Sequence, residues 1–354
     1  MINENDIREV LTQVMDPELH RNIVELGMVR EVQVGDGEVH LTLALTTLAC
    51  PLKDRIVEDI RQAIRTVDGG LAVTVHLTEM TNDERAAVMG GQQGHQYMAE
   101  ALNEVHRTIA VMSGKGGVGK SSIAALLAIA LRHQGQRVGL LDADITGPSI
   151  PRMFGLHGMP ETCPFGLEPA LTRTGIKVMS INLLLPDEDE AVIWRGPLIS
   201  GAIRQFWGDV FWDRLDTLVI DLPPGTSDAT LTVMQSLPVD GAVLVTSPQD
   251  LAGMVVRKAA RMVQQMNKPI LGLVENMSYV VCPDCGKRIE VFGPSRAEET
   301  AQAVGIPLLG RIPLDPELAR LCDSGLVETY SPAVMAPIAA AIVARLPEAK
   351  VHSN

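Results

Sequence analysis

Seven short apolar segments, separated by helical patterns, organise the chain from residue 108 onward. Several are continuous hydrophobic runs, which is the pattern of strands that helices cover on both faces. The alternation of strands and helices predicts an α/β domain with a doubly wound, mostly parallel sheet. The predicted strands are residues 108–112, 137–141, 176–181, 217–220, 242–246, 270–274 and 308–312.

The first 80 residues have a different pattern, which predicts a small α+β domain. Apolar side chains at helical spacing indicate an opening helix near the N-terminus. Residues 29–34 and 39–45 alternate in hydrophobicity around a Gly-Asp-Gly turn, so they are predicted to pair as a hairpin. Pro51 stands at the favoured first position of a second helix, and residues 71–77 are a third predicted strand.

Between these two parts the periodicity is lost. Residues 82–106 contain Gly90-Gly91 and Gly94, and are predicted to form a linker, interrupted by a short helix near residues 97–105. The predicted organisation is a small domain (1–81), a linker (82–106), a large domain (107–346) and a tail (347–354).

Composition and charge narrow the class of protein. Of the 354 residues, 46% are hydrophobic, which argues against a disordered chain. The 43 acidic residues outnumber the 30 basic ones, and a net charge of −13 disfavours nonspecific binding to nucleic acid. No apolar stretch approaches the roughly 18 residues of a membrane-spanning helix, and the N-terminus lacks the pattern of a secretory signal. We therefore expect a cytoplasmic protein that binds neither nucleic acid nor membrane, with free cysteines.

A glycine-rich segment, Gly114-Lys115-Gly116-Gly117-Val118-Gly119-Lys120-Ser121, follows a predicted strand and fits the pattern G-x-x-x-x-G-K-[ST]. Glycines allow consecutive backbone N–H groups to turn toward phosphate oxygens, and the N-terminus of the next helix adds its positive end. Lys120 is expected to reach the β- and γ-phosphates of ATP, and the hydroxyl of Ser121 to bind Mg²⁺. The alternative is a glycine-rich turn with no ligand.

Lys115 is a second lysine, at the start of the same loop, and it cannot also occupy the position of Lys120. One interpretation is a solvated surface charge. The other is a cation that reaches the phosphates bound by a neighbouring subunit, where it stabilises charge as an arginine finger does.

Cys282 and Cys285 form a Cys-x-x-Cys pair followed by a glycine, which permits a sharp turn. Two thiolates at this spacing can grip one metal ion, but they are half of a four-coordinate site. Cys50, Cys163 and Cys322 are each isolated, so a second pair has to come from elsewhere. A symmetric dimer would bring two pairs together at its two-fold axis. A redox pair or an incidental turn are the alternatives.

The loop sequence Lys-Gly-Gly-Val-Gly-Lys-Ser resembles the deviant phosphate loop of the MinD/ParA-like ATPases. In that family the early lysine acts across a nucleotide-sandwich dimer, which implies this role for Lys115. Asp142-Ala143-Asp144 matches the first switch, and the match implies that Asp144 lies near the attacking water and Mg²⁺. Leu218-Val219-Ile220-Asp221 matches the second metal-supporting strand, which implies that Asp221 holds Mg²⁺ through water.

Further motifs occur in order along the chain: Asp16–Glu18, Thr46–Leu52, Asp144–Pro151, Trp194–Pro197, Asp221–Asp228 and Glu275–Ser278. With the cysteine pair, the last four of these motifs make residues 107–346 similar to the Mrp (ApbC-type) family of iron–sulfur cluster carriers, and the first two lie in residues 1–80. Residues 1–80 resemble the PaaD-like iron–sulfur assembly domain that is commonly fused ahead of such ATPases.

The resemblance implies a [4Fe–4S] cluster bridged between two subunits by Cys282 and Cys285. It also implies adenine contacts from Asn276 and from the loop around Pro313. Ser122 stands where the family usually has Thr after the loop serine, and keeps the hydroxyl expected at the nucleotide. In the second switch, Ser227 replaces the usual Gly.

Cys50 precedes the helix that Pro51 is predicted to open, and the positive end of that helix would favour a thiolate. A small buried cysteine is the alternative.

The leading functional hypothesis is a homodimeric, ATP-hydrolysing carrier that uses ATP and Mg²⁺, receives a [4Fe–4S] cluster from scaffold proteins and delivers it to apo-protein acceptors. One alternative is a MinD/ParA-like partitioning ATPase, which needs a basic surface or a basic amphipathic C-terminal helix. Residues Leu346–Val351 show neither feature. Another alternative is a targeting ATPase that holds zinc between paired Cys-x-x-Cys turns and carries hydrophobic peptides.

Overall fold

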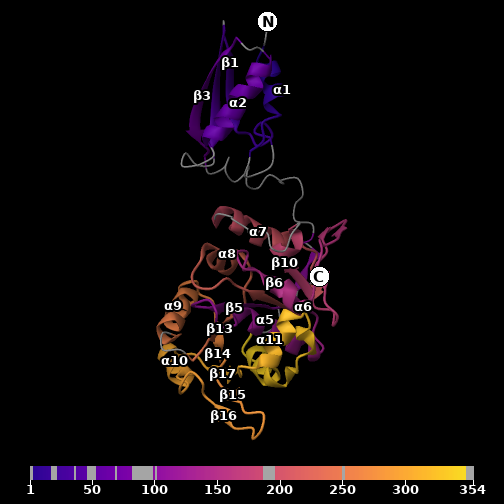
Figure 1. Ribbon diagram of the computed structural model, residues 1–354, viewed down its shortest axis with the longest axis vertical. Helices are drawn as coiled ribbons and strands as arrows, with labels where there is room; N and C mark the ends of the chain where they lie inside the picture. Colours follow the sequence, from indigo (N-terminus) through magenta and orange to yellow (C-terminus); the bar gives the residue numbers. More distant parts are fainter. Residues whose placement is uncertain are drawn as a thin grey trace. The chain divides into compact units, whose positions relative to one another are not determined.

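The chain folds into two compact units, Met1–Gln96 and Tyr97–Asn354, in the computed structural model shown in Figure 1. The structure describes residues 3–16, 22–35, 37–45, 53–67, 70–81, 99, 102–185, 196–248 and 252–347. None of the helices in these segments combines the length and the apolar composition that crossing a membrane requires.

The first unit is the small α+β domain that the sequence predicts. Its sheet has the order β1–β2–β3, with β1 antiparallel to β2 and β2 parallel to β3. Apolar side chains of both helices and of the sheet, including Ile7, Leu41 and Ile60, are buried in one cluster, so the unit has its own core. The elements are α1 (Glu4–Leu11), β1 (Val29–Val34), β2 (Glu38–Leu45), α2 (Lys53–Val67) and β3 (Ala72–Glu79).

An eight-stranded sheet forms the centre of the second unit, in the order β17–β14–β13–β5–β12–β6–β10–β9. Neighbouring strands are parallel except at one edge, where β9 is antiparallel to β10. All seven predicted strands are present. The strands are β5 (Thr108–Ser113), β6 (Val138–Asp142), β9 (Ala170–Leu171), β10 (Lys177–Ser180), β12 (Thr217–Asp221), β13 (Gly241–Thr246), β14 (Ile270–Glu275) and β17 (Leu308–Arg311).

Helices cover both faces of this sheet (Figure 1). Along β5, Ile109 and Val111 contact the layer of α5, α6, α11 and α12, while Ala110 and Met112 contact the layer of α7 to α10. Because both faces are buried, the strand has the continuous hydrophobic run seen in the sequence. The helices are α5 (Lys120–His133), α6 (Ile150–Phe154), α7 (Gly196–Gly208), α8 (Asp228–Ser236), α9 (Ala252–Gln265), α10 (Ala297–Val304), α11 (Pro316–Asp323) and α12 (Ala336–Val343).

At the start of the second unit, residues 99 and 102 are helical, within the predicted short helix near residues 97–105, but the end of the predicted linker differs from the structure. Glu104–Val105 forms a strand, β4, that pairs with β11 (Arg214–Leu215). The side-chain amide of Asn103 donates to the carbonyl of Val210 at 2.9 Å. A two-residue strand is too short to produce a recognisable pattern. The other short elements are β7 (Thr162–Cys163), β8 (Gly166–Leu167), β15 (Val280–Val281), β16 (Arg288–Ile289), and the 3₁₀ turns η1 (Ile181–Leu184), η2 (Val327–Thr329) and η3 (Pro332–Val334).

Candidate nucleotide site and cysteine hairpin

The predicted phosphate loop lies at the carboxyl end of β5, in the middle of the sheet, and leads directly into α5. Gly117 and Gly119 have φ angles of 76° and 73°, in the left-handed region that glycine adopts without strain. A Cβ atom at Gly119 would also overlap the side-chain amide of Asn276. At Gly114, a Cβ atom would come within 2.6 Å of the carbonyl oxygen of Val255 in α9. The loop is therefore closely packed between α9 and the segment that follows β14.

Lys120, the first residue of α5, forms a buried ion pair with Asp221 at the end of β12. Its ammonium nitrogen is 2.5 Å from Oδ1 of Asp221 and 3.3 Å from the hydroxyl oxygen of Ser121. The Lys120 and Asp221 side chains are 6% and 0% exposed, so each buried charge depends on the other for compensation. The second carboxylate oxygen of Asp221, Oδ2, is buried and has no hydrogen-bond partner among the described residues.

Asp142, at the end of β6, organises the turn that carries Asp144. Its Oδ1 accepts the backbone N–H of Asp144, and its Oδ2 accepts those of Ser149 and Ile150, each at 3.1 Å. Asp144 is 9% exposed and accepts a hydrogen bond from the hydroxyl of Thr146 at 3.2 Å. The fully buried Asp142 thus holds both ends of the first switch segment, and Asp144 lies between them.

The carboxylates of Asp142, Asp144 and Asp221 all interact with the buried ammonium group of Lys120. Burial and, after it, the nearby charge of Asp221 raise the pKa of Asp142 to about 7. Burial also raises the pKa of Asp144 and that of Asp221, while Lys120 opposes both shifts. A divalent cation would neutralise this excess of buried negative charge. The Oδ2 atom of Asp221 and the hydroxyl of Ser121 are oxygen donors of the kind that Mg²⁺ prefers, so the residues fit the predicted ion.

Asn276 and Pro313, which are expected to contact adenine, lie on neighbouring segments at the carboxyl ends of β14 and β17. The side-chain amide of Asn276 donates to the carbonyl of Val118 in the phosphate loop at 2.9 Å. Met277 has a φ angle of 56°, which is uncommon for a residue other than glycine and typical of functional sites. The N–H of Ser278 donates to the carbonyl of the residue before Pro313 at 2.9 Å. Backbone hydrogen bonding therefore joins the two segments.

Glu275, the last residue of β14, connects this region with the cysteine hairpin. Its carboxylate is 1% exposed and accepts hydrogen bonds from the hydroxyls of Ser278 and Ser295. The same carboxylate is 3.3 Å from Nε of Arg311. Arg311 in turn donates to Glu290 at 2.6 Å, and Glu290 directly follows β16 of the hairpin. A continuous polar network thus runs from the end of β14 to the base of the hairpin.

The cysteine pair lies in the turn of a small antiparallel hairpin formed by β15 and β16. The N–H of Cys282 donates to the carbonyl of Lys287, and the N–H of Gly286 to the carbonyl of Cys282, both at 2.9 Å. Cys282 is partly exposed, Cys285 is exposed, and both thiols are free. The backbone N–H of Cys285 and, less strongly, that of Asp284 lower the pKa of the Cys282 thiol. The turn therefore favours a thiolate, the form that binds metals.

This hairpin carries two candidate metal ligands, which are not a complete set. Across the described part of the chain, no three side chains of Cys, His, Asp or Glu converge in an arrangement that could hold a metal ion. Cys163 is in β7, and Cys322 is on α11, where burial raises the pKa of its thiol and the hydroxyl of Ser122 lies within hydrogen-bonding contact. Cys50 lies outside the described residues.

A family model of NUBPL iron-transfer P-loop NTPases matches residues 104–346, and a model of iron–sulfur cluster assembly proteins matches residues 4–77. The first match alone spans more than half of the chain. The chain belongs to the iron-transfer P-loop NTPase family. The match begins at Glu104, the first residue of β4, a few residues inside the second unit, which starts at Tyr97.

Known proteins support the same assignment for this iron-transfer NTPase. An iron–sulfur cluster carrier protein of Synechocystis is 43% identical over 332 residues, which cover 92% of this chain and 91% of the relative. Among solved structures, a nucleotide-binding protein of Archaeoglobus fulgidus in complex with ADP is 50% identical, with a TM-score of 0.59, over 65% of this chain and 91% of that one. The cell-division ATPase MinD of Pyrococcus furiosus is 23% identical, with a TM-score of 0.51, over 68% and 99% of the two chains, and shows the shared fold. The predicted family, fold and P-loop ATPase class are confirmed.

The structure brings Lys120, Ser121, Asp144 and Asp221 together at the carboxyl ends of the central strands β5, β6 and β12. The cysteine pair lies apart from them on its hairpin. Lys115 is half-buried at the start of the loop, and its carbonyl accepts a hydrogen bond from the hydroxyl of Ser113 at 2.9 Å. The catalytic and binding roles of these residues remain predictions.

Two further acidic residues of this iron-transfer NTPase have roles that the sequence analysis does not assign. Asp142 and Glu275 belong to the motifs Asp142-Ala143-Asp144 and Glu275–Ser278, of which only Asp144 and Asn276 receive a function from the family resemblance. For Asp142 a signal was available, because it ends an apolar strand as Asp221 does. The same signal was available for Glu275, which ends the apolar strand β14, but its pairing with Arg311, distant in the sequence, could not be predicted.

Proposed function

We propose that this iron-transfer NTPase is an ATP-hydrolysing carrier that holds a [4Fe–4S] cluster between two copies of the chain and delivers it to apo-proteins. The observation that carries the proposal is the cysteine hairpin. Its two free thiols, one with a lowered pKa, form half of a four-thiolate site on a P-loop ATPase. The cluster carrier proteins among its relatives support the same function.

A dimer with two-fold symmetry completes the cluster site. Each copy contributes Cys282 and Cys285, which gives the four thiolates that a [4Fe–4S] cluster takes. Apolar side chains near the turn are also exposed, and the contact with a second copy would cover them. These side chains are Val281, Ile289 and Val291, at 47%, 46% and 50% exposure.

The nucleotide site is proposed to bind and hydrolyse ATP with the residues that the loop pattern indicates. Lys120 and the loop N–H groups bind the phosphates. Ser121 and Asp221 would hold Mg²⁺, which would neutralise negative charge on the phosphates. Asp144, held in place by Asp142, orients the attacking water. Lys115 of one copy stabilises the phosphates bound by the other. The Archaeoglobus relative binds ADP, which supports a nucleotide in this site.

The network around Glu275 connects the two sites. Asn276 contacts the phosphate loop, and the adjacent Glu275 is joined through Arg311 to Glu290 at the base of the hairpin. We propose that hydrolysis changes this network and thereby the hold of the hairpin on its cluster.

The remaining parts of the proposal concern the partner proteins, the location in the cell and the role of the first unit. We propose that scaffold proteins supply the cluster in the cytoplasm, and that the first unit adjusts the transfer of the cluster and does not complete the ATP site. Cys50 would then be a transient ligand. The match of residues 4–77 to iron–sulfur cluster assembly proteins supports this role for the first unit.

Anaerobic purification, followed by absorption spectroscopy, metal and sulfide analysis, and a measurement of molar mass, tests the proposal. We expect a dimer with about four iron and four sulfide ions per two chains. The same four thiolates could hold zinc. If the anaerobically reconstituted protein took up zinc alone, a zinc-bridged targeting ATPase would replace the carrier.

A further inference from the structure

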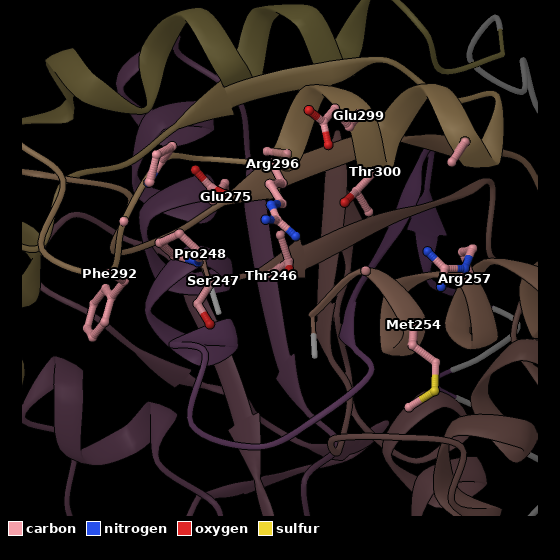
Figure 2. A pocket seen from close by; sticks show the side chains of 15 residues that line it. Thr246, Ser247, Pro248, Met254, Arg257, Glu275, Phe292, Arg296, Glu299 and Thr300 are labelled. Carbon is pink, nitrogen blue, oxygen red and sulfur yellow. The ribbon is translucent and has the colours of Figure 1, made fainter. Parts of the chain in front are cut away.

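A groove on the second unit, shown in Figure 2, is lined by residues other than those of the phosphate loop and the cysteine turn. It has a volume of about 620 Å³ and lies between the carboxyl ends of β13 and β14, the first turns of α9, and α10. The floor includes Thr246 and Ser247, which are buried, and the hydroxyl of Ser247 has no hydrogen-bond partner among the described residues. The exposed rim residues are Met254, Arg257, Phe292, Arg296 and Glu299. The groove is open to solvent and has the size of a ligand site.

Arg257 and Thr300 converge above the backbone of Gly253, in the first turn of α9. A Cβ atom at Gly253 would lie 3.3 Å from Nη1 of Arg257 and 3.5 Å from Oγ1 of Thr300. Because glycine has no side chain, this space between a guanidinium and a hydroxyl is left for an atom of a ligand. The N-terminal end of α9 adds a positive potential at the same place. Figure 2 shows Arg296, at the start of the same helix as Thr300, reaching into the groove toward Thr246.

The charge around the groove favours an anion, although the whole chain carries a net charge of −13. Helix α9 contains Arg257, Lys258 and Arg261, all of them exposed, and no acidic residue. At the floor, the carboxylate of Glu275 is already compensated by an ion pair and two hydroxyl donors. Glu299 places one exposed carboxylate on the rim.

Apolar side chains flank this anion-binding position. Met254 and Phe292 are each 46% exposed, so both offer apolar surface to a ligand in the groove. Phe292 lies on the segment that leaves β16, so a ligand in the groove contacts the same segment that carries the cysteine turn. A concave site with apolar flanks favours a peptide, which carries apolar side chains beside its acidic ones, over the uniformly charged backbone of a nucleic acid.

We propose that this groove binds an acidic, extended peptide segment of the protein that receives the cluster. A carboxylate of that segment lies between Arg257 and Thr300 above Gly253, and separate apolar side chains of the segment lie against Met254 and Phe292, which are at opposite ends of the groove (Figure 2). The identity of the partner rests on the proposed carrier function, whereas the binding chemistry rests on the groove alone. Docking here holds the acceptor next to the cysteine hairpin before transfer.

The first test uses the full chain without cluster or nucleotide, and a fluorescein-labelled peptide of alternating Glu, Asp and Leu residues. The control peptide has Lys in place of every acidic residue. Fluorescence anisotropy should show saturable binding of the acidic peptide only. Arg257→Glu should weaken binding about tenfold or more, because it reverses the charge at the anion position. Arg261→Glu, one turn further along α9 and outside the groove, is the matched control and should change the affinity less than about threefold.

Two more variants separate a specific groove from general charge attraction. Gly253→Leu fills the space below Arg257 and Thr300 and should abolish binding, while the backbone there accepts a side chain because its φ is not positive. Thermal unfolding verifies that this variant is folded. Glu299→Gln removes the carboxylate on the rim and should strengthen binding up to about threefold. Equal effects of Arg257→Glu and Arg261→Glu, or a wild-type chain that binds neither peptide, would overturn the proposal.

The second test measures cluster delivery to apo-aconitase. Arg257→Glu should slow delivery at low acceptor concentration, with ATP hydrolysis and cluster content unchanged, and Arg261→Glu should not. If the peptide binds as expected but the protein holds no cluster, the groove stands and the carrier function fails. If the cluster is present and both variants bind the peptide and deliver alike, the groove assignment fails. A short DNA duplex that displaces the peptide as well as unlabelled acidic peptide does would also overturn it, in favour of a nucleic-acid site.

Discussion

The phosphate loop and the cysteine hairpin belong to the same unit, but they are built in opposite ways. At the loop, the charges of Lys120 and Asp221 are buried and paired within the chain. At the hairpin, Cys282 and Cys285 are at least partly exposed, and across the described residues nothing completes their ligand set. The charged residues of the loop are thus already paired within one chain, whereas the hairpin has only two of the four thiols that a four-coordinate site needs.

This difference corresponds to two different tasks. Catalysis on a nucleotide needs charges that are fixed before the substrate arrives, and burial among packed helices and strands fixes them. A cargo site has to release what it holds, and an exposed, shared site can open without unfolding anything. Changes to the buried charges at the loop should therefore affect both activity and stability, whereas changes at the hairpin should affect the cargo alone.

Lys120→Ala should have the largest effect, because it removes the cation at the phosphates and leaves Asp221 buried without its partner. ATP hydrolysis should fall below detection, and the free energy of unfolding should fall by about 3 kcal/mol. Burial already raises the pKa of Asp221, and loss of Lys120 raises it further. For a carboxyl whose folded-state pKa is above its unfolded value near 3.9, stability is lost as the pH rises through the folded-state pKa. Urea unfolding should thus show a smaller cost at about pH 5 than at about pH 8.

Lys115→Ala is the matched change on the same loop. Since Lys115 is only half-buried, unfolding should change by less than about 0.5 kcal/mol, while hydrolysis falls at least about 100-fold and ATP still binds. Mixed dimers of the two lysine variants should regain part of the activity, because one of their two sites has Lys120 from one chain and Lys115 from the other. If no mixture regains activity, Lys115 does not act across the dimer.

Cys282→Ser and Cys285→Ser test the other side of the comparison. Each should lose iron and sulfide, because one thiolate per chain leaves two ligands across a dimer, while ATP binding and the unfolding free energy stay within about 0.5 kcal/mol of the unmodified protein. Cys163→Ser is the control and should keep its iron. Iron and sulfide analysis of the anaerobically purified variants tests this prediction. Full iron content in both hairpin variants would contradict the ligand assignment.

Arg311→Met tests whether the two regions communicate, since Arg311 links Glu275 with Glu290. Each site should keep its own function, and stability should fall by about 1–2 kcal/mol because buried Glu275 loses its cation. The expected signature is a smaller effect of ATP on the rate at which a chelator removes iron. Arg320→Met, which breaks the exposed Arg320–Glu317 pair on α11, should leave that ATP effect unchanged.

The hydrophobic pattern was sufficient to predict the seven main strands, because most of them are buried on both faces and are therefore continuous apolar runs between helices. The family motifs located Lys120, Asp144 and Asp221. Contacts between residues that are distant in the chain could not be predicted in this way. Such contacts depend on how the loops at the carboxyl ends of the strands fold over one another. Examples are the bond from Asn276 to Val118, the pairing of Glu275 with Arg311, and the convergence of Arg257 with Thr300.

The smallest expected effect on ATP hydrolysis belongs to a test of where the second unit begins. In the structure, Asn103 donates to Val210 and accepts from the N–H of Asp213, both at 2.9 Å, and β4 pairs with β11. A fragment of residues 97–354 keeps these bonds, whereas a fragment of residues 107–354 loses them. At about 1 kcal/mol for each bond that is partly shielded from water, the shorter fragment should unfold at about 2 kcal/mol lower free energy in urea.

Both fragments should hydrolyse ATP at the rate of the full chain, because the phosphate loop, the acidic residues and the cysteine hairpin all follow residue 107. Equal stability of the two fragments would place the start of the unit at residue 107, as the sequence pattern predicts. A loss of hydrolysis in both would show that the first unit takes part in the nucleotide site. In that case neither the nucleotide site nor the cluster site would be complete within the second unit, and the two regions would no longer differ in this respect.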